Sequence, residues 1–258
     1  MPSKNDKKRW DKIASKFNEW MKTDDYPQNF ADKVHKEPEY TVLDLGCGNG
    51  SITLKVAKEV EHVTAVDMSE EMLKLVEKNA EKEGISNISY VQSTVEDLEP
   101  ERVGQHDVVI ASRSLGNIYN LKDELKKIDN IARKYVYMTI WGANSRRFER
   151  ELCDTMGVEY HQHPDYIYVC NMLYQMGIYA NVEMLDCQSR PVYSDLEDAM
   201  DRCKWKLGWN LKEIKSEDLE KLEKFLKESA VQKEDGTLDY PTKNPDWVMI
   251  WWKKEDSD

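Results

Sequence analysis

The chain has 258 residues, of which 40% are hydrophobic, 10% aromatic and 33% charged, and its formal net charge is -12. This composition is too apolar and too aromatic for a disordered chain, and the acidic balance argues against generic binding to nucleic-acid phosphates. No stretch reaches the roughly 18 uninterrupted apolar residues that a membrane-spanning helix needs. No apolar run follows the basic N-terminus, so we expect no secretory signal.

The cysteines are an odd number and none of them has the C-x-x-C spacing. They are Cys47, Cys153, Cys170, Cys187 and Cys203. This pattern argues against a disulfide framework and a zinc site, and favours a reducing compartment. We therefore expect a soluble, cytoplasmic, globular protein, and an α/β enzyme of this length is often a single domain.

From residue 41 onward, short apolar runs alternate with segments of helical period. Ser69 is placed to cap a helix that ends at Gly84. The predicted strands of this half are 41–45, 62–67, 88–92, 107–112 and 135–140. The predicted helices are 51–60, the segment after Ser69 with Met72, Leu73, Val76 and Ala80 on one face, and a segment with Leu121, Leu125, Ile128 and Ala132 at helical spacing. This alternation predicts right-handed βαβ crossovers and a mainly parallel sheet covered on both faces.

The second half is less regular. Residues 164–177 are compatible with a strand or a helix, and their length together with Gly177 favours a helix. The other predicted elements are helices at 146–157, 194–208 and 217–230, and strands at 182–187 and 247–252. The apolar stripe of the last helix is expected to pack on the core rather than bind a partner: Leu219, Leu222, Phe225, Leu226 and Ala230. No boundary signal separates the two halves.

The most informative segment is the turn that follows the first predicted strand. It has glycine at alternate positions, Gly46, Gly48 and Gly50, and a helix is predicted to begin directly after it. Glycines let the chain turn tightly and let a ligand approach the backbone, and N–H groups at a helix N-terminus donate to polar ligands. The turn lies at the carboxyl edge of the sheet, where open α/β sheets bind ligands.

Two classes of ligand suit such a turn. A dinucleotide fold has the spacing G-x-G-x-x-G, whereas Ser51 stands here where the third glycine would fall. Asp44 precedes the turn and suits a cationic, amine-bearing ligand better than a pyrophosphate. Asp67 ends the next predicted strand and can accept both hydroxyls of a ribose, a feature that both ligand classes share.

These residues resemble a known family. The run D-L-G-C-G-N-G at 44–50, the acid Asp67 and the strand HDVVIAS together resemble a class I S-adenosylmethionine-dependent methyltransferase. The resemblance covers residues 40–141 well and the remainder in outline. It implies a Rossmann-like, seven-stranded, mostly parallel sheet with helices on both faces, an antiparallel last strand and helical additions in the C-terminal half. It also implies S-adenosyl-L-methionine as the cofactor.

The family pattern assigns roles to individual residues. Asp44 would face the amino group, Asp67 would hold the ribose and Met68 would pack on the adenine. Thr94 stands where the family often has an aspartate for the adenine amino group, so Glu96 is an alternative for that contact. The full set of implied cofactor-binding residues is Asp44, Gly46, Cys47, Gly48, Asn49, Gly50, Asp67, Met68, Thr94, Val95, Glu96, Ala111 and Ser112.

The resemblance also divides the chain. We expect a single domain over 1–258, with an N-terminal helical lid at 1–40, a cofactor-binding half at 41–141 and a substrate-side half at 142–258. The lid carries an aromatic stripe at helical spacing, Trp10, Ile13, Ala14, Phe17 and Trp20, for which core packing is the simpler explanation and cofactor contact the alternative.

The acceptor is less well defined. Methyl transfer depends mainly on the alignment of the donor with the nucleophile and does not require a single catalytic group. No catalytic residue is therefore assigned. Methyltransferases that act on adenine N6 or on glutamine often carry Asn-Pro-Pro-Tyr at this position. This chain has Ser112-Arg113-Ser114-Leu115 instead, so these two acceptors are disfavoured. The predicted substrate-binding residues are Asn117, Tyr119, Trp141, His161, His163 and Tyr166, and Arg113, Arg146 and Arg147 are candidates for holding an anionic substrate.

No metal site is predicted, because His161 and His163 have no third ligand nearby in sequence. We expect methyl transfer to a small molecule, with no nucleic-acid or membrane partner and an undetermined oligomeric state. The alternatives are an RNA or protein methyltransferase, a non-catalytic S-adenosylmethionine-binding subunit and a nicotinamide oxidoreductase.

Overall fold

The computed structural model describes residues 4–142, 147–160, 165–189, 191–208, 214–240 and 246–255. Its centre is a seven-stranded sheet. In spatial order the strands are β3 (Ile88–Gln92), β2 (His62–Asp67), β1 (Thr41–Leu45), β4 (His106–Ser112), β5 (Ala132–Trp141), β9 (Trp247–Lys253) and β6 (Asn181–Met184). The pairs from β3 to β5 are parallel, and β9 runs antiparallel to both β5 and β6. The predicted mostly parallel sheet with an antiparallel last strand is confirmed.

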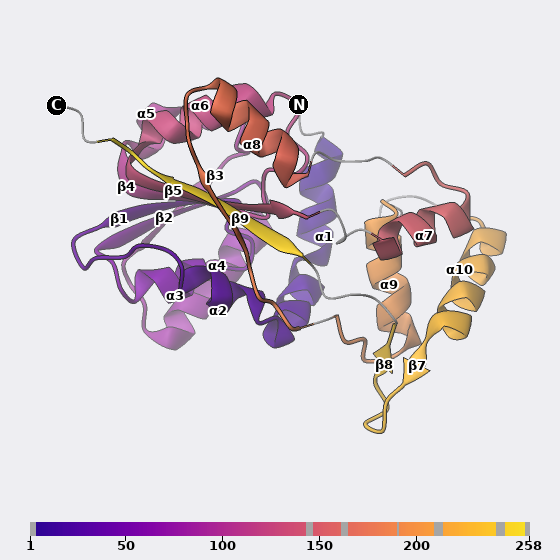
Figure 1. The fold of residues 1–258 in the computed structure, drawn as a ribbon. Helices are drawn as coiled ribbons and strands as arrows, with labels where there is room; N and C mark the ends of the chain where they lie inside the picture. The colour runs from indigo at the N-terminus through magenta and orange to yellow at the C-terminus, as the bar shows by residue number, and fades with distance from the viewer. Residues whose placement is uncertain are drawn as a thin grey trace.

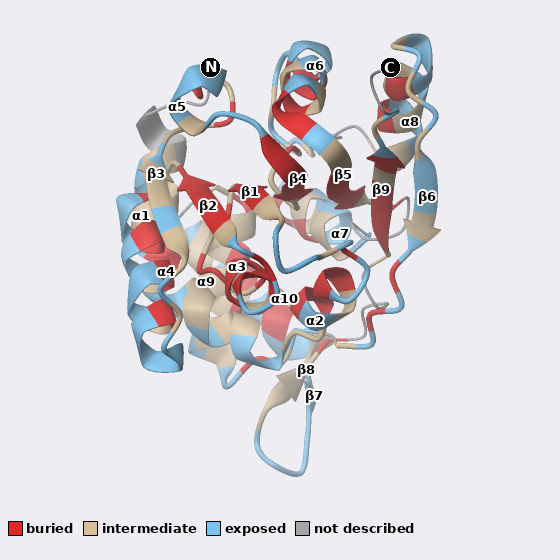
Figure 2. Ribbon diagram, turned by 90° about the vertical axis from the view of Figure 1, so that its left-hand side faces the viewer, coloured by how far each residue is buried: buried red, intermediate tan, exposed pale blue. Residues whose placement is uncertain are grey.

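Helices cover both faces of the sheet (Figure 1). On one face lie α5 (Pro100–Val103), α6 (Leu121–Ile131) and α8 (Tyr166–Gln175), and on the other α2 (Tyr26–Ala31), α3 (Thr53–Ala57) and α4 (Glu70–Glu83). Each face of the sheet has its own hydrophobic core, and successive residues of a strand belong to opposite cores. Leu43 packs on the α6 and α8 side, whereas Val42 packs on the α2 and α3 side. Because the central strands are covered on both sides, they are continuous apolar runs, and Figure 2 shows them almost wholly buried.

The helix α4 forms as its sequence predicts. Ser69 has extended dihedrals and its Oγ accepts a hydrogen bond from the Met72 N–H at 3.2 Å, which satisfies one free donor of the first turn. Gly84 ends the helix in the left-handed region at φ +68°. The predicted apolar face is buried against the sheet: Met72, Leu73, Val76 and Ala80.

Several predicted boundaries were wrong. The strand predicted at 182–187 ends at Met184, because its partner β9 begins at Trp247 and supplies one last bond, from the Leu185 N–H to the Trp247 carbonyl at 2.9 Å. Ala132 does not continue α6. It has extended dihedrals and starts β5. The helix predicted at 51–60 is only Thr53–Ala57, whereas α8 confirms the helix predicted within 164–177.

A second group of elements packs around its own core beside the sheet (Figure 1). It consists of α7 (Arg147–Met156), α9 (Leu196–Lys206), α10 (Ser216–Ser229) and the hairpin β7 (Val231–Gln232) and β8 (Leu238–Asp239), here called the helical unit. Leu222 and Leu226 of the predicted α10 stripe are fully buried in this core, together with Leu152, Cys203 and Tyr240. None of the described helices is long and apolar enough to cross a membrane.

The N-terminal helix α1 (Lys4–Trp20) joins the helical unit to the sheet. It packs against α4 on one side. On the other side the rings of Trp10 and Trp20 meet Trp205 of α9 at centroid distances of 5.2 and 6.4 Å. The Trp20 indole N–H also donates to Asp198 at 2.8 Å. Both tryptophans of the predicted aromatic stripe are therefore used in packing between these two parts of the molecule.

Candidate cofactor and acceptor sites

The glycine turn follows β1 and is anchored to the end of β2. The N–H groups of Gly46 and Cys47 both donate to the Val66 carbonyl, at 2.8 and 3.0 Å. Gly46, Gly48 and Gly50 have φ of +74°, +55° and +82°, a region that costs residues with a Cβ about 1–2 kcal/mol. A Cβ on Gly46 would overlap the Cβ of Ser114, and one on Gly50 would lie 2.8 Å from Val76. A Cβ on Gly48 would meet only Phe17 of α1, at 3.8 Å.

Alanine at position 46 is expected to destabilise the fold by about 2–4 kcal/mol, since it adds both backbone strain and an overlap with the segment after β4. Gly84→Ala is the matched control, because Gly84 also has a positive φ but a Cβ added there would have no atom within 4 Å. That variant should lose only about 1 kcal/mol. Urea denaturation of both variants measures the difference. Equal losses of stability in the two variants would show that Ser114 does not pack tightly against Gly46.

Asp67 at the end of β2 supports this turn. Only 9% of the residue is exposed. Its Oδ2 accepts the Gly48 N–H at 2.9 Å and its Oδ1 accepts the Ser69 N–H at 2.8 Å. Each oxygen of a carboxylate has two acceptor positions, so each keeps one for a ligand hydroxyl. Burial raises the pKa of Asp67, and the charge of nearby Asp11 adds to this, against the two backbone bonds.

Asp44, in β1, is the second buried carboxylate beside the turn. It is 3% exposed, and its Oδ2 accepts the Thr53 hydroxyl at 2.6 Å. Burial raises its pKa to about 6, opposed by the Thr53 bond and reinforced by the charge of Asp67. Within the described residues, neither carboxylate forms an ion pair with a lysine or arginine. Two buried acids without a cation fit an amine-bearing nucleoside and do not fit a pyrophosphate.

The remaining predicted cofactor residues surround the same sheet edge. Ala111 and Ser112 end β4, beside the turn, and Met68 is half-buried after Asp67. Asn49 donates to Asn18 of α1 at 3.1 Å, and the buried Cys47 packs with Leu73 and Val76 of α4. The loop after β3 carries Thr94, Val95 and Glu96. The Thr94 hydroxyl accepts the Asp97 N–H at 2.9 Å and so forms a local turn, whereas burial raises the pKa of half-buried Glu96.

The predicted acceptor residues do not come together. Tyr119 is 95% exposed and Asn117 is exposed. Tyr166 packs on the α6 and α8 side of the sheet, whereas Trp141 packs on the opposite side, with its ring 3.9 Å from that of Trp247. His161 and His163, like Arg146, lie outside the described residues. Among the predicted acceptor residues that the structure describes, Trp141 alone ends a central strand, β5, which pairs with β4.

Comparison with known proteins supports what the geometry indicates. A family model described as "Methyltransferase domain" matches residues 36–190, more than half of the chain. The chain belongs to the class I S-adenosylmethionine-dependent methyltransferases. Its cofactor is S-adenosylmethionine, and the two buried acids beside the glycine turn suit such an amine-bearing nucleoside.

Relatives of this methyltransferase fall into two groups. An uncharacterized protein of Haemophilus influenzae is 29% identical over 95% of this chain and 88% of its own length. The ubiquinone biosynthesis O-methyltransferase of Acinetobacter baylyi is also 29% identical, but over only 46% of this chain and 50% of its own length. Among solved structures, the YcgJ protein of Bacillus subtilis has a TM-score of 0.60 at 12% identity and covers 90% of this chain and 98% of its own. A putative methyltransferase of Bacillus halodurans has a TM-score of 0.59 at 15% identity, covering 88% and 97%. These structures support the fold.

The methyltransferase has further residues at this edge that the sequence did not indicate. The Tyr26 hydroxyl lies 2.5 Å from the Ser112 Oγ and also contacts the Thr139 hydroxyl, which joins α2 to the ends of β4 and β5. Burial raises the pKa of Tyr26 to about 12. A local signal for α2 was present: Asp24 accepts the Tyr26 N–H at 3.0 Å and Pro27 stands in the first turn. The contacts of Tyr26 with Ser112 and Thr139, which are distant in sequence, have no local signal of this kind.

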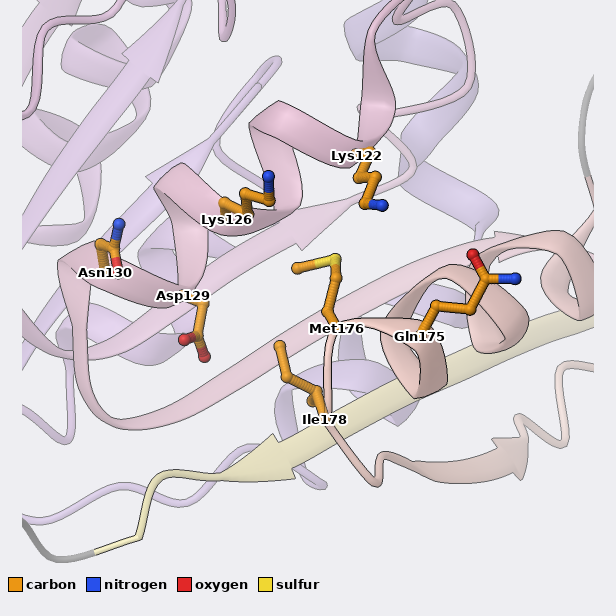
Figure 3. A pocket seen from close by; sticks show the side chains of 7 residues that line it. All are labelled: Lys122, Lys126, Asp129, Asn130, Gln175, Met176 and Ile178. Atoms are coloured by element: carbon orange, nitrogen blue, oxygen red, sulfur yellow. The ribbon is translucent and has the colours of Figure 1, made fainter.

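One surface hollow lies elsewhere. A cavity of about 380 Å³ separates α6 from α8 on the outer side of the sheet (Figure 3). It is lined by Lys122, Lys126, Asp129, Asn130, Gln175, Met176 and Ile178, none of which is a predicted site residue. In the described part of the chain, no three His, Cys, Asp or Glu side chains are grouped to hold a metal ion.

Proposed function

We propose that this methyltransferase transfers a methyl group from S-adenosylmethionine to a small organic acceptor, and that residues 44–50 and Asp67 hold the donor. The observation that carries the cofactor part is the pair of buried carboxylates without a cationic partner in the described residues, Asp44 and Asp67. Asp67 would accept the ribose hydroxyls at the positions left free by its two backbone bonds. Asp44 would pair with the amino group.

The proposal extends to the acceptor. The aromatic side chains of Tyr26, Trp141 and Trp247 gather where β4 and β5 end. Tyr26 and Trp247 are buried, and the half-buried Trp141 suits contact with a small organic molecule from which water is excluded. The net charge of -12 disfavours an RNA acceptor. The name of the Acinetobacter relative, an O-methyltransferase of ubiquinone biosynthesis, supports an acceptor of this size.

Bound S-adenosylmethionine supplies an electrophilic methyl group on a sulfonium. Held by residues 44–50 and Asp67, it would supply this methyl group to a lone pair of the acceptor. The protein aligns the two partners and excludes water. Since the pKa of Tyr26 is about 12, its hydroxyl stays protonated at neutral pH. It therefore donates a hydrogen bond rather than removing a proton.

The expected division of the chain belongs to the same proposal, with α1 as a lid over the glycine turn and the helical unit on the acceptor side. Phe17 and Asn18 of α1 already lie against Gly48 and Asn49. A cytoplasmic location is also part of it, because all five cysteines are free thiols.

Isothermal titration with S-adenosylmethionine tests the cofactor. We expect one site per chain with a dissociation constant in the micromolar range, and no heat with NAD. Incubation with methyl-labelled donor and a cell metabolite extract then tests turnover. Absence of binding to folded protein would disprove the proposal, and binding without any labelled product would favour a non-catalytic subunit.

A further inference from the structure

Arg113 has an unusual backbone conformation at the centre of the proposed site. It follows the last residue of β4, and its φ is +55°, the one positive φ among the described residues other than glycine. Such a conformation costs about 1–2 kcal/mol and persists where the surroundings enforce it. Here the Arg113 N–H donates to the Thr139 hydroxyl at 3.1 Å, and Ser114 lies against Gly46. The segment Arg113–Ser114 is thus fixed by β5 and by the glycine turn, next to the point between β1 and β4 where the strand order reverses.

The guanidinium of Arg113 lies among aromatic rings. Its Cζ is 4.0 Å from the centroid of Tyr26 and 5.1 Å from that of Trp247, and the side chain is 22% exposed. These rings attract the cation and limit its rotation. The Trp141 ring in turn packs on Trp247. An arginine and three large rings therefore meet at one end of the sheet.

The guanidinium is incompletely paired in the described structure. Nη1 lies 3.0 Å from Asp24 Oδ2, but Nη2 reaches only the thioether sulfur of Met21, at 3.6 Å. A guanidinium pairs best with a carboxylate through two parallel N–H···O bonds. The observed arrangement supplies one oxygen and one weak acceptor, so a carboxylate that approached squarely would be a better partner.

The present partner, Asp24, does not belong to the sheet. It follows the short helix η1 (Met21–Thr23), which connects α1 to α2. Its other oxygen accepts the Tyr26 N–H at 3.0 Å and the Ser189 hydroxyl at 3.4 Å. Asp24 therefore keeps bonds of its own if it is displaced from Arg113. The structure shows that a carboxylate fits this position and that Asp24 has two further hydrogen-bond donors that do not involve Arg113.

We propose that Arg113 binds the carboxylate of an aromatic acid as methyl acceptor, in exchange for Asp24, so that Arg113 determines specificity for anionic acceptors. This inference rests on the proposed methyl transfer. The half-buried ring of Trp141, which packs on Trp247, provides apolar contact for a flat acceptor, and the guanidinium orients its acidic end. Asp24 belongs to the connection that follows α1, so its release links acceptor binding to the N-terminal helix.

The test uses the full-length protein saturated with S-adenosylhomocysteine. Hydroxylated benzoic and cinnamic acids are titrated beside their primary carboxamides, which have the same shape without the charge. We expect at least one acid to bind at least tenfold more tightly than its amide. In Arg113→Gln this preference should disappear, and in Arg113→Lys, which keeps the charge but loses the two-pronged geometry, it should fall at least fivefold. Asp24→Asn should strengthen acid binding at least threefold, because it removes the competitor.

Arg133→Gln is the matched control, since Arg133 also pairs with an aspartate, Asp107, but at the opposite end of β4. It should leave the ratio of acid to amide affinity unchanged. A purely structural role for Arg113 would weaken acids and amides alike and is excluded by this ratio. Equal binding of acids and amides, absence of acid binding, or weaker acid binding in Asp24→Asn would overturn the inference. Cofactor titration of the same samples separates these results from failure of the proposed function, which would show as no cofactor binding by the unmodified protein.

Discussion

Replacement of Asp67 by alanine is expected to weaken the binding of S-adenosylmethionine at least tenfold. Charge-assisted hydrogen bonds from the ribose hydroxyls to this carboxylate would be worth about 1.5–3 kcal/mol. The variant also removes the acceptor of the Gly48 and Ser69 N–H groups, so the glycine turn loses its support in β2. Isothermal titration measures the change in affinity, and circular dichroism confirms that the protein is folded.

Asp107→Ala is the control for this experiment. Asp107 is also a buried aspartate, 7% exposed, and it accepts hydrogen bonds from the Thr41 N–H and from Arg133. It lies at the start of β4, however, at the end of the sheet opposite the glycine turn. We expect lower stability and unchanged cofactor affinity. If both variants bind the cofactor as tightly as the unmodified protein, Asp67 does not hold the ribose.

The sheet could be predicted because its signals are local. Each central strand is a short apolar run buried on both faces, and each ends at a residue that the alternation of elements identifies. The glycine turn was equally local, since three glycines and two acids lie within a few residues of β1 and β2. The spacing of these residues alone is compatible with two classes of ligand, and the resemblance to the family then assigned a role to each residue.

The acceptor side could not be predicted in the same way. The contact between Tyr26 and Ser112 joins residues that are 86 positions apart, and nothing in either segment indicates the other. Tyr119 is an acceptor candidate in the sequence because it follows β4, yet it is 95% exposed, whereas Tyr26 is fully buried beside Ser112 and has no sequence signal for that contact. An aromatic residue after a strand says little about where its ring packs, because packing depends on elements from elsewhere in the chain.

Asp44→Asn is expected to have opposite effects on stability and on cofactor affinity. A carboxyl group with a pKa of about 6 in the folded protein and about 3.9 in the unfolded chain binds protons more tightly when folded. Stability therefore falls as the pH rises from about 4 to about 6, and at pH 7 the ionised, buried Asp44 destabilises the free protein by about 2–3 kcal/mol. Asparagine is neutral, and its side-chain oxygen can still accept the Thr53 hydroxyl.

Thermal unfolding of the cofactor-free protein measures the first effect. At pH 7 the variant should be about 1–3 kcal/mol more stable, and at pH 4, where Asp44 is protonated in the folded protein and partly protonated in the unfolded chain, the difference should nearly vanish. Saturating S-adenosylmethionine should then stabilise the unmodified protein much more than the variant, because the stabilisation by a ligand increases with its affinity. If Asp44→Asn is less stable than the unmodified protein at pH 7, ionised Asp44 does not destabilise the cofactor-free protein.

Cofactor affinity should also depend on pH through the same group. We expect the cofactor's ammonium group to pair with ionised Asp44, so affinity for the unmodified protein should fall as the pH drops below about 6, by up to tenfold per unit. In Asp44→Asn the affinity should be at least tenfold weaker at pH 7.5 and the fall towards acid should be smaller. Any fall that persists in the variant is assigned to Asp67, whose pKa burial also raises. The free protein thus keeps an unfavourable buried charge that has no cationic partner among the described residues, and this is the physical basis for expecting an amine-bearing nucleoside at the glycine turn.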